Sequence, residues 1–112
     1  MALSQAAARF GGDHYPTDHD GAVNLAWNII ANINIPIGAA VSTEHPDELD
    51  YTQWVSVSDL GRRRYYFRDY DNLDIRFVDL MKLGTVNTPL AFSMKQAPRY
   101  QELTDSGQAM TE

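Results

Sequence analysis

The stretch from Asp50 to Leu80 constrains the fold of this chain most, because it predicts three short antiparallel β-strands joined by two tight turns. Its first part alternates two sets of side chains with a period of two, which is typical of a strand with differently solvated faces. The two sets are Tyr51, Gln53, Val55 and Val57, and Thr52, Trp54, Ser56 and Ser58. An aromatic-rich run from Arg64 to Tyr70 fits a second pleated strand, and the apolar run from Ile75 to Val78 fits a third.

The two turns of this predicted meander have distinct chemistry. Asp59-Leu60-Gly61 supplies the first turn, with Gly61 free to take a positive φ, and Asp71-Asn72 supplies the second. Arg62 to Arg64 lie at the tip of the first hairpin, where we expect a solvated turn that also protects the strand edge. We expect the strand aromatics, Trp54 among them, to pack in a core rather than to line an acyl or sterol pocket.

Two helices are predicted before the meander. An Ala-rich run within Met1 to Tyr15 predicts a short helix that is broken at Gly11-Gly12. A second helix is predicted from about Asp20 to Asn32, after a polar hinge with several possible N-caps, Thr17, Asp18 and Asp20. Its apolar stripe consists of Ala22, Ala26, Ile29, Ile30 and Ile33, widened by Val23 and Trp27. One broad face of this helix should therefore pack on the sheet.

The remaining segments have weaker signals. Pro36 and Gly38 stop the helical pattern, and an acidic loop is expected from Glu44 to Leu49. A last strand is predicted through Leu90-Ala91-Phe92. Residues 1–95 are therefore assigned to one folded segment, and the polar stretch 96–112 to a disordered tail.

Composition excludes several classes of protein. Nine Lys and Arg against fifteen Asp and Glu give a net charge of −6, which disfavours a phosphate backbone, so no nucleic acid partner is expected. No apolar run approaches the ~20 residues that span a bilayer, and the N-terminus lacks the pattern of a secretory signal, so no membrane partner is expected. The chain contains no cysteine, which excludes disulfides, thiolate metal sites and a thiol nucleophile and leaves the compartment unknown.

A histidine and aspartate cluster is the one candidate for a metal site. It comprises Asp13, His14, Asp18, His19 and Asp20. The two histidines are five residues apart with Pro16 between them, whereas helical zinc pairs sit at i and i+4. We therefore interpret the cluster as a solvated loop with capping aspartates and predict no metal and no cofactor. His45 receives no role.

Five phrases of the sequence resemble, in the same order, those of the linear-amide C–N hydrolases. This family, part of the N-terminal-nucleophile superfamily, comprises choloylglycine (bile salt) hydrolases and penicillin V acylases. The phrases are Ala8-Arg9-Phe10, Ile33-Asn34-Ile35-Pro36-Ile37-Gly38, Asp50-Tyr51-Thr52-Gln53-Trp54, Tyr65-Tyr66-Phe67-Arg68 and Tyr70-Asp71-Asn72.

The resemblance implies an α+β fold, namely a partial αββα sandwich in which one main helix packs on an antiparallel β-meander. It also implies that Arg9 is the family arginine that lies beside a catalytic cysteine, favouring the thiolate and the oxyanion. The alternative is an ordinary surface arginine on a short helix. The family's N-terminal cysteine attacks a small-molecule N-acyl amide such as a conjugated bile salt or penicillin V, and its members commonly form tetramers, so a homo-oligomer or self-association is expected.

Three hypotheses remain open from the sequence. The chain is a C-terminal fragment of a linear-amide hydrolase, because the family's cysteine, aspartate and oxyanion groups precede the segment seen here and only Arg9 can be matched. Alternatively, it is a stand-alone binding or assembly module that kept the fold segment without catalysis. A third possibility is an unrelated small α+β domain with an accidental resemblance, which the order of the phrases disfavours.

Overall fold

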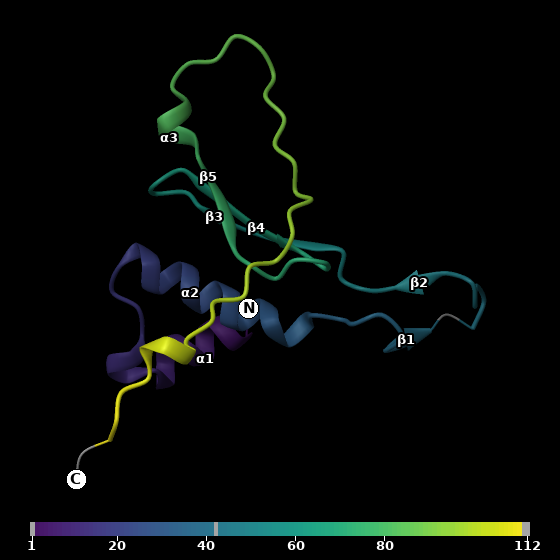
Figure 1. The fold of residues 1–112 in the computed structure, drawn as a ribbon, viewed down its shortest axis with the longest axis horizontal. Coiled ribbons are helices and arrows are strands. Elements are labelled where there is room, and N and C mark those ends of the chain that lie inside the picture. The colour runs from purple at the N-terminus through teal and green to yellow at the C-terminus, as the bar shows by residue number, and fades with distance from the viewer. Residues whose placement is uncertain (1, 42, 111–112) are drawn as a thin grey trace.

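The predicted β-meander forms the centre of the fold (Figure 1). The computed structural model describes residues 2–41 and 43–110. In these ranges, a sheet of strand order β3-β4-β5 comprises β3 (Trp54–Asp59), β4 (Arg64–Asp69) and β5 (Arg76–Asp79). Both strand pairs are antiparallel, and each strand follows its neighbour along the chain. The predicted α+β class and the antiparallel meander are therefore confirmed.

The register of the strands divides the sheet into two faces, because directly opposed residues point to the same side. The face that we call the helix face comprises Val55, Val57, Asp59, Arg64, Tyr66, Arg68, Phe77 and Asp79. The open face comprises Trp54, Ser56, Ser58, Tyr65, Phe67, Asp69, Arg76 and Val78. Trp27 stacks with Arg68 and His19 contacts Asp59, so the second helix packs on the helix face along β3 and β4, while Phe77 of β5 stays 48% exposed.

This second helix, α2 (His19–Ile30), is the main helix of the structure and continues into the 3₁₀ turn η2 (Ala31–Ile33). Asp18 is its N-cap, because Oδ1 of this residue accepts a hydrogen bond of 2.8 Å from the Gly21 N–H. Trp27 is only 6% exposed and is the buried residue of the predicted stripe. The stripe ends earlier than expected, since Ile33 is 70% exposed where the chain leaves the sheet.

The N-terminal helix is also present, as α1 (Ala2–Phe10), and the 3₁₀ turn η1 (Gly12–His14) follows it. Gly12 has a φ of 55°, which explains why the helix ends at the predicted glycine pair. No residue of α1 is buried. Among the described residues, no helix has the length and apolar character needed to cross a membrane.

A short hairpin that the sequence did not predict extends from the body between α2 and β3 (Figure 1). Its strands β1 (Ala40–Val41) and β2 (Leu49–Asp50) pair antiparallel around the acidic loop. We call this hairpin, with the residues that lead into it, the arm (residues 35–52). Thr52 closes its base, since its N–H donates to the Ile35 carbonyl at 3.0 Å and its hydroxyl accepts from the Ile35 N–H at 2.9 Å. Strands of two residues are too short for a periodicity to reveal them.

Two expectations about the meander were wrong. Gly61 does not take a positive φ; Arg63 does, with a φ of 56°. A Cβ at Gly61 would lie 2.6 Å from Cε1 of His19, so a larger residue there would displace the His19 side chain. Tyr66 on the helix face and Phe67 on the open face are buried as expected, whereas Trp54, also on the open face, is 60% exposed.

The predicted strand at Leu90-Ala91-Phe92 is absent. A short helix, α3 (Leu80–Leu83), follows β5 directly, and its Met81 N–H donates to Asp79 Oδ1 at 3.0 Å. The chain then turns away from the sheet at Gly84, whose φ is 63°, so the apolar run beyond has no strand beside it to pair with. The C-terminal stretch contains the 3₁₀ turn η3 (Thr104–Ser106). Its disorder, and the division at residue 95, stay predictions.

Truncating Trp27 should remove most of the contact between α2 and the sheet. We expect Trp27→Ala to lower the free energy of unfolding by about 3 kcal/mol, as for other buried aromatics that are replaced by alanine. Trp54→Ala is the matched control, and it should change this free energy by less than about 0.5 kcal/mol because the side chain is already exposed. Equal losses for the two variants in urea unfolding would contradict the assigned packing.

Candidate functional site

Arg9, the one catalytic residue expected from the sequence, lies in the last turn of α1. Its side chain is exposed, and its guanidinium carbon lies 5.1 Å from the centre of the neighbouring Phe10 ring. In the described part of the chain, no carboxylate, hydroxyl or amide pairs with its guanidinium. The structure therefore does not bring Arg9 together with any other chemical group, and its role stays a prediction.

A cluster of charged side chains joins the start of α2 to the turn between β3 and β4. We call it the Asp59 cluster; it consists of His19, Asp20, Asp59 and Arg62. Arg62 donates from Nε to Asp59 Oδ2 at 2.7 Å and from its backbone N–H to Oδ1 at 3.1 Å. Its Nη2 lies 2.8 Å from Asp20 Oδ1, and His19 Nδ1 lies 3.3 Å from Asp59 Oδ1.

This cluster corrects the expectation of a solvated arginine turn. The Arg62 side chain is 26% exposed and bridges two carboxylates that belong to different elements. Arg64 lies 3.6 Å from Asp79 on β5 and stacks 4.9 Å from the centre of the Phe77 ring. Only Arg63 is exposed as predicted. These contacts tie the first turn to α2 and to β5, a role that charge patterns in the sequence do not indicate.

The arrangement keeps Asp59 ionised. The hydrogen bond from the Arg62 side chain, together with weaker contributions from the Arg62 backbone and from His19, outweighs burial and lowers the pKa of Asp59 from 3.8 to about 2. The same pair raises the pKa of Arg62. A carboxylate with such a low pKa is a poor general base near neutral pH, so the cluster suits the attachment of α2 to the sheet better than proton transfer.

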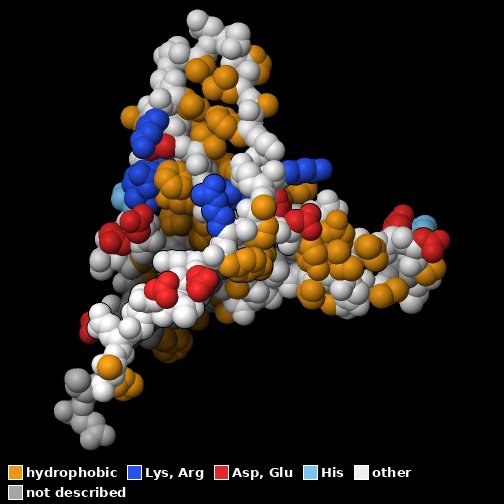
Figure 2. Space-filling view, viewed as in Figure 1, with side chains coloured by type: hydrophobic (Ala, Val, Ile, Leu, Met, Phe, Trp, Pro, Cys, Tyr) orange, Lys and Arg blue, Asp and Glu red, His pale blue; other side chains and the backbone are white. Residues whose placement is uncertain are grey.

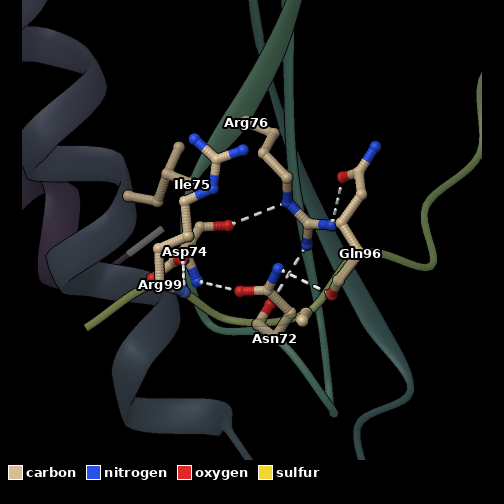
Figure 3. Close-up of a pocket in the computed structure, with 7 residues that line it drawn as sticks. Asn72, Asp74, Ile75, Arg76, Gln96 and Arg99 are labelled. Carbon is tan, nitrogen blue, oxygen red and sulfur yellow. Dashed lines mark hydrogen bonds between the residues drawn. The ribbon is translucent and has the colours of Figure 1, made fainter.

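A second polar centre lies at the turn between β4 and β5. Asn72, expected only as a turn residue, is 2% exposed, and its amide donates to the Gln96 carbonyl at 3.0 Å. Arg76 donates to the carbonyls of Met94 at 2.6 Å and Asn72 at 3.1 Å. Figure 3 shows the Asn72 amide and the Arg76 guanidinium both contacting Gln96, the first at its backbone carbonyl and the second at its side chain. The contacts join residues 18 and 24 positions apart, which explains why local sequence reasoning missed them.

The cavity beside this centre measures about 390 Å³. It is lined by Asn72, Asp74, Ile75, Arg76, Gln96, Ala97 and Arg99 (Figure 3). Arg76 also bonds to the Asp74 carbonyl, at 3.1 Å, and to the Gln96 side chain, at 3.0 Å. Backbone and amide oxygens thus occupy its donors, and the cavity presents no activated nucleophile.

The histidines of the N-terminal hinge belong to different elements. His14 ends η1, whereas His19 opens α2 and contacts Asp59, which is 40 positions away in the chain. Among the described residues, no group of three or more His, Asp or Glu could hold a metal ion. His19 therefore acts with Asp59, a partner that the sequence did not suggest because the two are so distant along the chain.

Acid should weaken the fold through Asp59. Its pKa is lower in the folded chain than in the unfolded chain, so its contribution to stability is present above the unfolded value and is lost as pH falls from about 5 to about 2. We expect Asp59→Asn to be less stable than the parent chain at pH 7 and to show a weaker loss of stability over this range. Asp105→Asn, in the exposed turn η3, is the control and should leave the pH dependence unchanged. If the melting temperatures of the parent chain and of Asp59→Asn fell by the same amount from pH 7 to pH 2, the assignment would be contradicted.

A comparison with known protein families agrees with the resemblance of the five sequence motifs. The model of the linear amide C–N hydrolases, choloylglycine hydrolase family, matches residues 13–91 of this 112-residue chain. The match contains α2, the arm and the whole meander, and therefore both the Asp59 cluster and the turn that contains Asn72. Arg9 lies before its first residue. The chain belongs to the choloylglycine hydrolase family of linear amide C–N hydrolases.

Proposed function

We propose that this chain forms the C-terminal part of a linear-amide hydrolase whose cysteine nucleophile belongs to a part of the enzyme that this chain does not contain. The observation that supports the proposal is family membership over residues 13–91 in a chain that has no cysteine. The chemistry of the family, as the resemblance implies it, needs a thiolate for the covalent step. In the complete enzyme, this chain would pack against the part that contains the cysteine and would not supply the attacking thiolate.

The two faces of the sheet support this proposal. α2 packs on the helix face, whereas the open face presents Trp54, Tyr65 and two serines, Ser56 and Ser58, to solvent. The exposed aromatic side chains of Trp54 and Tyr65 make this part of the open face suited to packing against another layer. The arm adds exposed apolar residues, which gather along it in Figure 2. They are Ile35, Ile37, Val41 and Leu49.

In the complete enzyme, Arg9 would act beside the cysteine. Its guanidinium is permanently charged and offers a planar fork of donors, which would favour the thiolate and the oxyanion of the tetrahedral intermediate. The exposed position at the end of α1 leaves this fork available, since among the described residues it contacts the Phe10 ring and no acceptor. The substrate would be a small N-acyl amide of the conjugated bile salt or penicillin V type, and the enzyme would be an N-terminal-nucleophile hydrolase.

A second candidate function is a catalytically inactive binding or assembly module. The hydrogen bonds and ion pairs within the chain favour this function. The Asp59 cluster holds the meander to α2, and the contacts of Asn72 and Arg76 hold it to residues 94–96, without another chain. An independent domain needs such internal contacts to stabilise its fold. Activity after restoration of the missing part distinguishes the two proposals.

Fusion to the N-terminal region of a family member should restore hydrolysis of a conjugated bile salt or of penicillin V, while the unfused chain should give no turnover. In the fusion, we expect Arg9→Lys to lower kcat by about 10²-fold, because lysine keeps the charge but loses the fork that contacts the oxyanion. Arg99→Lys is the matched control. An Arg9→Lys fusion with kcat within twofold of its parent, at equal thermal stability, would show that Arg9 is a bystander.

The isolated chain should self-associate through the open face and the exposed strand edges. At physiological salt, repulsion arising from the net charge of −6 is screened beyond ~8 Å, so the apolar contact should prevail. Sedimentation velocity at micromolar concentration should show dimers or larger species, and Trp54→Lys should shift them toward monomer. Leu60→Lys, in the exposed first turn, is the control. A sharply melting monomer would instead favour the stand-alone module.

A further inference from the structure

Arg68 is the charged residue of the helix face that lacks a charged partner. On this face Asp59 pairs with Arg62 at 2.7 Å, and Arg64 lies 3.6 Å from Asp79. Arg68 lies four residues further along β4 than Arg64, opposite Val55, and within the described ranges no carboxylate forms an ion pair with it. A partly buried charge without a partner is costly, and such charges in proteins are normally compensated.

The Arg68 guanidinium lies against Trp27. Its central carbon is 5.1 Å from the centre of the indole ring, the distance of a cation–π contact. Both side chains also have a buried donor without an acceptor, namely Nε of Arg68 and Nε1 of Trp27. Within the part of the chain that the structure describes, these are the two buried side-chain nitrogen or oxygen atoms without a hydrogen bond. Such groups are uncommon in folded proteins, and each calls for a specific explanation.

We propose that Arg68 and Trp27 form a carboxylate-binding site between β4 and α2. Stacking on the indole holds the guanidinium plane, so that its N–H groups are oriented before a ligand arrives. The site lacks a hydrogen-bond acceptor and a counter-charge. A carboxylate supplies both, because its two oxygens accept parallel hydrogen bonds from a guanidinium and its charge neutralises Arg68. A neutral molecule such as water would accept the hydrogen bonds but would leave the charge of Arg68 uncompensated.

The chemistry of the ligand is that of a planar monoanion, and two sources can supply it. One is a small free carboxylate. The other is an aspartate or glutamate of a second copy of this chain, whose arm has an acidic tip at Glu44, Asp47 and Glu48. The site requires neither the nucleophile nor Arg9, so it stands apart from the proposed hydrolase activity.

Nuclear magnetic resonance of the full 112-residue chain can test the site directly. The probe is sodium acetate, added at constant ionic strength against sodium chloride, while the Trp27 indole N–H and the Arg68 Nε–H signals are followed. The chain has two tryptophans, so Trp54→Phe assigns the indole signal. We expect both signals to move saturably with acetate and not with chloride. If the carboxylate comes from a second copy, the signals should instead move with protein concentration before any acetate is added.

Substitutions separate the site from general effects of charge. Arg68→Gln should weaken acetate binding, measured at the Trp27 signal, by about tenfold or more, because a charge-assisted pair is lost. Arg99→Gln removes an exposed guanidinium without a recorded side-chain partner and should leave binding within twofold. Arg68→Met keeps the apolar stem and should melt in chloride at the same or a higher temperature than the parent, since it removes an uncompensated charge.

Signals that respond neither to acetate nor to protein concentration would overturn the proposal. Equal responses to acetate and chloride would also overturn it, since they would show charge screening rather than recognition of a carboxylate. Lower thermal stability of Arg68→Met would mean that the charge is already compensated within the fold, and it would argue against the site in the same way.

Discussion

The packing of α2 onto the helix face of the meander is the contact on which the rest of the structure depends. It buries Trp27 against the sheet, and it places the start of the helix beside the first turn, where Arg62 bridges Asp20 and Asp59. The apolar contact supplies the larger driving force, because burying an aromatic side chain outweighs the net gain of most ion pairs. The charged cluster then sets the orientation of the helix, since its hydrogen bonds are directional and the apolar contact is not.

The same arrangement leaves the molecule asymmetric. One face of the sheet packs against a helix and contains paired charges, while the other presents Trp54 and Tyr65 to solvent. The exposed part of that second face is available for contact with a further layer or with a second copy. The polar contacts of Asn72 and Arg76 hold residues 94–96 against the turn between β4 and β5.

Much of the fold was predictable from local patterns. The period-two alternation and the aromatic run indicated the meander, the Ala-rich start indicated α1, and the apolar stripe after Asp18 indicated α2. Each of these signals depends on residues within one turn or two strands of each other. The predicted strand at Leu90-Ala91-Phe92 failed, because an apolar run becomes a strand only where a neighbouring strand offers its backbone.

The sequence by itself determined the family and the succession of helix and meander, because ordered phrases and periodicity are local properties of the chain. The tertiary structure alone decided which charges pair and which side chains are buried. His19 meets Asp59 across 40 positions, and Asn72 reaches Gln96 across 24, through folding that no local window contains. Arg68 on Trp27, which has no ion pair within the described residues, is of the same kind, since whether a charge has a partner depends on every element that surrounds it.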